Sequence, residues 1–315
     1  DPSQSTCAYN SDCKTPGEIC KNRACACECK TDQDCRAGSA CDGCGCIDDE
    51  QQVDGIVRGN LFIDSTLQFA GLRGVTEIHG GLTISGASLT DLGDTFAQLA
   101  LIDGPLQVTT SYNLNKVSFP KLTSATSATI SYVGAESVEL PLLKKALVNI
   151  NNLQKLTQLS LEALEEGELT LSQLPLLAQV KLPALKTVRL LQLSDVPLVS
   201  ELSLPELTTI SSTLQLSSSN PSALATLSAP NLTSLCVGPA VGSVTIDNTQ
   251  LSSLTGFGAK DFSSPSLSLQ PTRNPLLSDC QADVFASHFP QRIYTILSEN
   301  LTCAGTCTGT TCASN

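Results

Sequence analysis

A three-residue phrase recurs along the chain. Its first and third residues are apolar, and its middle residue is polar in every copy except the first. In an extended strand the two ends face one side and the middle residue faces the other. The last residues of successive phrases are 21, 24, 22, 20, 21, 22, 23, 30 and 23 residues apart. The phrases are Leu61–Ile63, Leu82–Ile84, Leu106–Val108, Ala128–Ile130, Val148–Ile150, Leu169–Leu171, Leu191–Leu193, Leu214–Leu216, Val244–Ile246 and Leu267–Leu269. Strands at this spacing indicate an internal repeat.

A second phrase, apolar-Pro-x-Leu, follows the first in the central repeats. It occurs at Phe119–Leu122, Leu140–Leu143, Leu161–Leu164, Leu182–Leu185, Leu204–Leu207 and Ala229–Leu232. Glu162 replaces the proline in the third of these. Proline lacks an N–H and is accepted at the end of a strand, where the chain turns a corner. Each repeat should therefore contain two strands, a corner and a further inward leucine.

A repeat of about 22 residues is too short for a strand and a full helix, so we expect a parallel β-solenoid. One coil cannot bury its leucines alone, whereas about ten stacked coils would form a continuous aliphatic column. The array should span residues 51–279, after tandem cysteine-rich modules at 1–50. A closing cap at 280–303 and a small polar tail at 304–315 follow. The interval of 30 residues before Ile246 predicts an inserted loop.

The middle residues of the phrases form an outward column that is largely uncharged. The candidate binding face consists of Thr83, Gln107, Thr129, Asn149, Thr170, Gln192, Gln215 and Thr245. Such residues suit any exposed parallel sheet, where they can hydrogen-bond along the stack. Alternatively they form a flat platform for a carbohydrate or a partner protein. The eight include no aromatic residue, which disfavours stacking of sugar rings.

The outward columns also argue against an enzyme. Solenoid lyases and hydrolases need clustered carboxylates or a basic side chain. The middle column ends at Ser268, and the next outward column is Asp64, Ser85, Thr109, Ser131, Asn151, Ser172, Ser194, Ser217, Asp247 and Gln270. Neither column puts two acids on adjacent coils. Glu165 and Glu166 fit a solvated corner, and His79 and His288 fit structural roles, so we expect a non-enzymatic protein without a cofactor.

Ten of the 15 cysteines lie in the first 46 residues and form two modules. They are Cys7, Cys13, Cys20, Cys25, Cys27, Cys29, Cys35, Cys41, Cys44 and Cys46. The modules contain almost no apolar side chains, so covalent staples must offset their chain entropy. Five cysteines per module predict at least one bridge between modules if all pair, and the connectivity stays open. A metal cluster is the alternative, but the absence of histidine and the wide C-x5-C intervals favour disulfides.

Charge and processing signals point outside the cell. Lys and Arg number 18 against 30 Asp and Glu, and this net charge of −12 disfavours nucleic acid and anionic membranes as partners. No apolar run is long enough to span a membrane. Asn231 and Asn300 begin glycosylation sequons, and Asp1 in place of Met fits a removed signal peptide. We therefore expect an exported protein, extracellular or at the cell surface.

Two Gly-x-Leu-x-apolar phrases, at Gly80–Ile84 and Gly104–Val108, carry a family resemblance. With the closing phrase Asn274–Cys280, followed by Cys303, they resemble receptor L domains over about residues 55–303. That resemblance implies a mainly β, right-handed parallel β-solenoid that binds through variable surfaces. The head resembles small EGF-like or defensin-like modules in style. The array is longer than a usual single L domain.

The end of the array should be closed by a helical cap. Residues 280–289 have helical spacing, Pro290 stops the helix, and Ile293, Tyr294 and Ile296 supply a last strand. A Cys280–Cys303 bridge would lock this cap over the open strand edges. Cys307 and Cys312 would form a clip in the tail. Cys236 would be left as a buried free thiol or in an unassigned bridge.

The function expected from these features is recognition or adhesion outside the cell. Partners would be a protein or a cell-surface carbohydrate. The alternative is a structural subunit that assembles head to tail into a filament, with the chain itself as the partner. Solenoids stack end to end naturally, and an odd cysteine count leaves room for intermolecular pairing.

Overall fold

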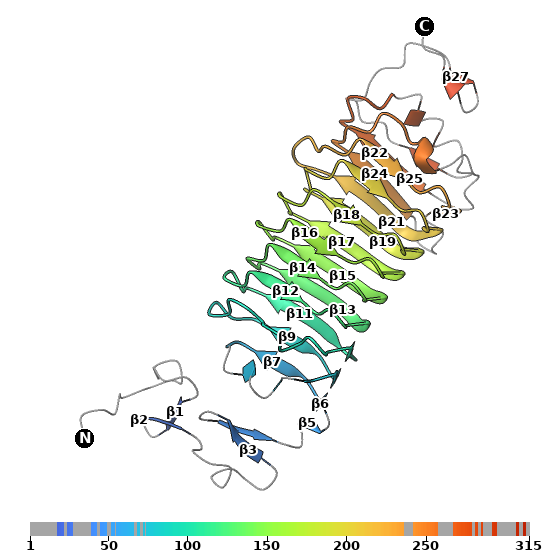
Figure 1. The fold of residues 1–315 in the computed structure, drawn as a ribbon. Coiled ribbons are helices and arrows are strands. Elements are labelled where there is room, and N and C mark those ends of the chain that lie inside the picture. Colours follow the sequence, from blue (N-terminus) through green and yellow to red (C-terminus); the bar gives the residue numbers. More distant parts are fainter. Residues whose placement is uncertain are drawn as a thin grey trace.

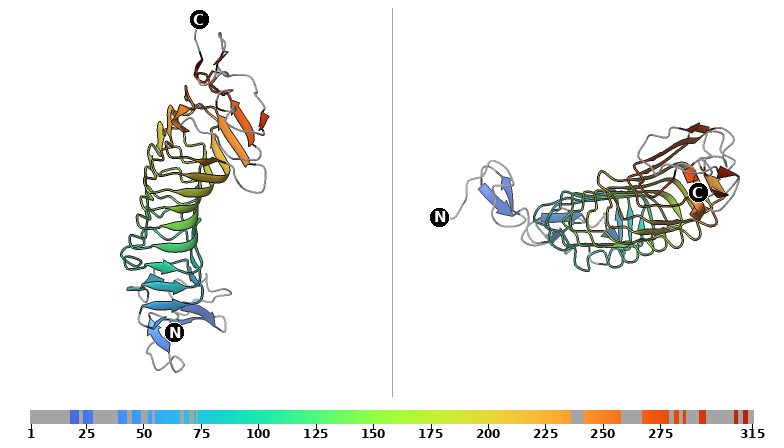
Figure 2. Two further views of the ribbon diagram at one scale, coloured as in Figure 1. Left: turned by 90° about the vertical axis from the view of Figure 1, so that its right-hand side faces the viewer. Right: turned by 90° about the horizontal axis from the view of Figure 1, so that it is seen from above.

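The computed structural model describes residues 18–21, 24–27, 39–42, 45–48, 52–53, 55–65, 68–69, 72, 74–235, 242–257, 267–278, 281–282, 285, 292–294, 307–308 and 311–312. Within these ranges the chain forms a parallel β-solenoid with coils of about 22 residues (Figure 1). The predicted solenoid is confirmed. Its coils follow one another along a single long axis (Figure 2).

One long sheet forms the wider wall of the solenoid. In the described ranges it has 16 strands, parallel except where β5 pairs with β6. Its first coils contribute two short strands each, whereas β13 to β21 cross the wall as single strands of seven to nine residues. The strands are β5 (Gln52–Val53), β6 (Ile56–Arg58), β7 (Leu61–Ile63), β8 (Glu77–His79), β9 (Leu82–Ile84), β10 (Leu101–Ile102), β11 (Pro105–Thr109), β13 (Ser124–Ser131), β15 (Lys145–Asn151), β17 (Glu166–Ser172), β19 (Thr187–Ser194), β21 (Thr209–Ser217), β23 (Ser234–Leu235), β24 (Gly242–Asp247), β25 (Leu267–Thr272) and β26 (Arg292–Tyr294).

Two three-stranded sheets form the second wall. They are β12 (Lys116–Ser118), β14 (Ser137–Glu139) and β16 (Gln158–Ser160), then β18 (Val180–Lys181), β20 (Glu201–Ser203) and β22 (Thr226–Ser228). The apolar-Pro-x-Leu phrase follows each strand as a turn, as the sequence predicts. The 3-10 helix η5 (Thr255–Phe257) lies beside β22.

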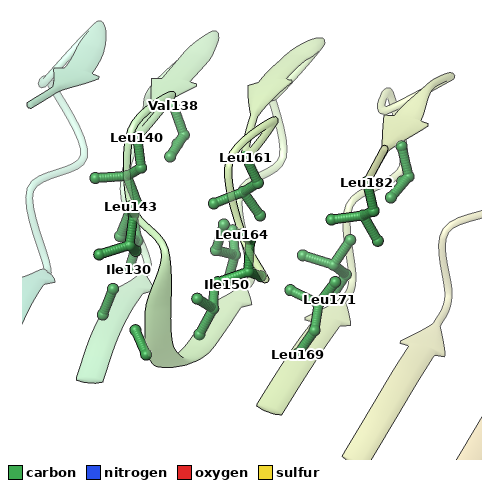
Figure 3. Close-up of a cluster of buried hydrophobic side chains, with 14 of the residues drawn as sticks. Ile130, Val138, Leu140, Leu143, Ile150, Leu161, Leu164, Leu169, Leu171 and Leu182 are labelled. Carbon is green, nitrogen blue, oxygen red and sulfur yellow. The ribbon is translucent and has the colours of Figure 1, made fainter. Parts of the chain in front are cut away.

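The core lies between the two walls. Aliphatic side chains from both walls pack together between them, as Figure 3 shows for Leu140, Leu161 and Leu171, all at most 1% exposed. The buried apolar residues form one continuous cluster from Val57 to Phe285. Burying a leucine contributes roughly 1.5–3 kcal/mol, so the array is held mainly by its aliphatic column.

The strand register confirms the predicted column of middle residues and corrects its last member. Thr83 pairs with Gln107 and Gln215 with Thr245, each at the predicted position. Gln270, and not Ser268, pairs with Thr245. The prediction of Leu267–Leu269 as the last phrase was therefore wrong by two residues. A two-residue shift keeps the same alternation, so pattern alone could not exclude it.

A left-handed backbone conformation recurs where strands of the long sheet end. Seven non-glycine residues there have φ between 49° and 58°: Thr110, Tyr132, Asn152, Gln173, Asp195, Asn248 and Arg273. Each directly follows a strand, so they occupy equivalent corners of their coils. This row of corners is the edge at which the groove described below lies.

The head and tail each contain hairpins with cysteines in opposed positions. Strands β1 (Glu18–Lys21) and β2 (Ala24–Cys27) align Cys20 with Cys25, and β3 (Ser39–Asp42) and β4 (Gly45–Asp48) align Cys41 with Cys46. The tail pair β27 (Cys307–Thr308) and β28 (Thr311–Cys312) aligns Cys307 with Cys312. Opposed residues of an antiparallel pair have Cα atoms about 4.5–5.5 Å apart, within the range of disulfides.

We therefore expect three local disulfides, Cys20–Cys25, Cys41–Cys46 and Cys307–Cys312. Peptide mapping of the unreduced protein after alkylation should recover each pair as one cross-linked fragment. Alkylated free thiols at these six positions, or stoichiometric zinc released from the head, would contradict the pairing.

Several predicted features lie outside the described residues. They are Cys7, Cys13, Cys29, Cys35, Cys44, Cys236, Cys280, Cys303, Asn300 and His288. Only Gln281, Ala282 and Phe285 of the cap helix are described, and they are helical. The cap and its bridge stay predictions.

Candidate functional site

The first feature of the site is the polar wall. We define it as the outward surface of the long sheet that carries the eight candidate residues. Their strands are neighbours in the sheet and the eight align in register from β9 to β24. Gln107 and Asn149 are exposed, and the other six are half-buried. The predicted column thus exists as one uncharged row along the long axis.

Hydrogen bonds on the polar wall hold several side chains in place. Asn151 Nδ2 donates to Asn149 Oδ1 at 2.9 Å, and Gln215 Nε2 donates to Ser217 Oγ at 3.1 Å. Ser194 Oγ and Ser217 Oγ lie 2.8 Å apart on neighbouring coils. Bonding between coils is present here, since Gln215 Nε2 also donates to Ser194 Oγ at 3.4 Å, but no hydrogen bond joins two of the eight described residues directly. Five of the eight make no side-chain hydrogen bond and remain available to a ligand: Thr83, Gln107, Thr129, Thr170 and Thr245.

A corner groove runs along the edge of the polar wall. It encloses about 370 Å³ and is lined by Asn152, Gln154, Gln173, Pro175, Asp195, Pro197, Ser218, Ser219 and Asn220. These residues belong to four successive coils, and in each coil the first of them directly follows a strand of the long sheet: Asn152, Gln173, Asp195 and Ser218. Asp195 Oδ1 accepts the Ser219 N–H at 2.6 Å, and Asn152 Nδ2 donates to Asn151 Oδ1 at 3.1 Å. The groove therefore has an ordered, amide-rich lining.

Exposed apolar side chains lie next to the lining residues in sequence or one coil away. Leu176 and Leu198 each follow a lining proline and are 47% and 48% exposed. Tyr132 occupies the corner one coil before Asn152 and is 48% exposed. The residues of the candidate column suggested a site without aromatics, but the structure puts an exposed tyrosine at the corner one coil before the groove.

A small-sheet cleft of about 350 Å³ opens on the second wall, where β16 and β18 belong to different sheets. Its lining includes Glu139, Leu159, Glu162 and Lys181. Glu162 stands at the one phrase that lacks proline, and Leu159 is only half-buried. A hydrogen bond from Lys116, opposed by burial, lowers the pKa of Glu139. This carboxylate is therefore already paired.

The acid–base residues that the sequence singles out in the described ranges, His79, Glu165 and Glu166, are engaged in contacts within the fold. His79 Nδ1 lies 2.5 Å from Asp103 Oδ2, and its Nε2 lies 3.1 Å from Glu77 Oε2. Both ring nitrogens are thus occupied. Glu165 pairs with Lys186 at 2.8 Å, which lowers the pKa of Glu165, and Glu166 pairs with Lys145 at 3.0 Å.

Asn231, the described sequon residue, lies exposed on a turn of the second wall. Its Nδ2 donates to the Pro205 carbonyl oxygen at 2.7 Å. Attachment of a glycan would replace this contact. Its modification stays a prediction.

No family model matches the chain, and no curated protein matches it. Among the described residues, no helix has the length and apolar character needed to cross a membrane.

Proposed function

We propose that the protein is a non-enzymatic recognition or adhesion protein, extracellular or at the cell surface, that binds its partner through the polar wall. The uncharged, ordered row from Thr83 to Thr245 carries this proposal. A stack of coils with a continuous core presents such a row without rearrangement, which lowers the entropic cost of binding. The opposed cysteines of the head and the exposed sequon support an oxidising compartment.

The same proposal includes a right-handed solenoid that resembles receptor L domains. The stacked Gly80 and Gly104 phrases support it. Gly104 packs so closely on Gly80 that a Cβ there would lie 2.7 Å from the Gly80 carbonyl oxygen. The resemblance to L domains implies recognition of a partner through variable surfaces.

Paired lysine substitutions test the polar wall. We expect Thr170→Lys with Gln192→Lys, on neighbouring strands, to weaken binding to arrays of cell-surface glycans and secreted ectodomains at least about tenfold, because desolvated charge lacks a partner. Ser203→Lys with Ser228→Lys, register neighbours on the second wall, is the matched control. Equal loss in both variants, or release of cleaved product from an array polysaccharide, would contradict the proposal.

A further inference from the structure

We propose that the corner groove is a subsite for a neutral oligosaccharide chain that lies along the solenoid axis. This inference rests on the proposed recognition function and names its ligand class. Four successive coils line the groove, and strands lie about 4.8 Å apart, so its length is roughly 14 Å. A short linear chain of sugar units fits that shape.

The chemistry of the lining selects hydroxyl-rich ligands. Gln154, Gln173 and Asn220 are exposed amides, and no hydrogen bond from these described side chains to the protein is seen. Each amide offers donors and an acceptor in one plane, which suits neighbouring hydroxyl groups. Pro175 and Pro197 supply apolar surface for the C–H faces of the rings.

Tyr132 extends this arrangement by one coil. Its corner position precedes that of Asn152, and its ring is about half exposed. Aromatic faces pack against the C–H faces of sugars. A chain that follows the groove would thus meet an aromatic ring at one end.

Charge disfavours anionic glycans in this groove. The lining contains no basic side chain, and its only carboxylate, Asp195, already accepts a backbone N–H. The protein carries a net charge of −12, which repels polyuronates and sulfated chains. The uncharged amides that make up most of the lining favour neutral chains.

The small-sheet cleft provides matched controls for the groove. Gln158 and Gln179 line that cleft and are exposed, like Gln154 and Gln173 in the groove. The same double substitution can therefore be made at each place. Tyr132→Phe keeps an aromatic ring, whereas Tyr132→Ala removes it.

Isothermal titration of the full chain with neutral cello-, manno- and chito-oligosaccharides of two to six units tests the subsite. We expect at least one series to bind, with affinity rising to about four units and then levelling. Gln154→Ala with Gln173→Ala should weaken binding at least about tenfold and Tyr132→Ala about fivefold, whereas Gln158→Ala with Gln179→Ala and Tyr132→Phe should not. Thermal unfolding checks that each variant is folded.

The outcomes separate this inference from the proposed function. Stronger binding of oligogalacturonate than of every neutral series, or loss of binding only in the Gln158/Gln179 variant, would overturn the subsite. If no oligosaccharide binds while the arrays show a polar-wall ligand, the subsite is wrong and the recognition function stands. If the arrays also show no ligand, both fail.

Discussion

Leu171→Ala should lower the free energy of unfolding by about 3–4 kcal/mol. Leu171 is fully buried, and its register neighbours are Ile150 and Leu193 on the adjoining coils. Removing it leaves a cavity in the shared aliphatic column, so both neighbouring coils lose contacts. Urea unfolding followed by circular dichroism measures the loss.

Leu147→Ala is the matched control for this substitution. Leu147 lies on the adjacent strand β15 but points outward and is 48% exposed. Its loss should cost less than about 0.5 kcal/mol. Similar losses in the two variants would show that the core is not the principal source of stability.

Gly167→Ala should destabilise the protein by at least about 2 kcal/mol. Gly167 has φ of +138°, and a Cβ there would lie 1.9 Å from the Ala146 carbonyl oxygen. The obstacle is backbone of the neighbouring strand, so it cannot move aside without disturbing the pairing of β15 and β17. A shift in register next to Gly167 marks the same place as a β-bulge.

Gly93→Ala measures the cost of a positive φ alone, without a steric clash against neighbouring backbone. Gly93 also has positive φ, at +53°, but a Cβ there meets nothing within 4 Å. Only the conformational penalty of about 1–2 kcal/mol should remain. Equilibrium unfolding of both variants under one set of conditions gives the difference, and equal losses would contradict the close approach at Gly167.

The repeat predicted most of the wall because two phrases recur in step. Alternation fixes which residues face inward, and the proline phrase fixes where each coil turns. Alternation does not fix the register, which is why the last coil was misplaced at Leu267–Leu269. The strands also extend upstream of their phrases: β21 begins at Thr209, five residues before Leu214.

The corner groove could not be predicted from the same patterns. Three of its corner residues share a backbone conformation and not a side-chain type, since Asn152 and Gln173 carry amides whereas Asp195 carries a carboxylate. Glu162 was visible as a departure from the repeat. The second wall is split into two sheets next to Glu162, between β16 and β18. This split depends on how neighbouring strands pair, and the sequence of one coil does not specify that pairing.

Hydroxyl-radical footprinting with and without the strongest array ligand tests the central claim, recognition at the polar wall and its corner, most directly. Leu176, Leu198 and Leu142 are exposed leucines at 47%, 48% and 46%, so their intrinsic oxidation should be similar. Leu176 and Leu198 each follow a proline that lines the groove, and Leu142 lies on a turn of the second wall. Leu147, which is 48% exposed, points outward on the polar wall itself. Bound ligand should protect Leu147, together with Leu176, Leu198 and Tyr132 if it also fills the groove, and leave Leu142 unchanged. Protection of Leu142 with Leu147, Leu176 and Leu198 still oxidised would contradict the account.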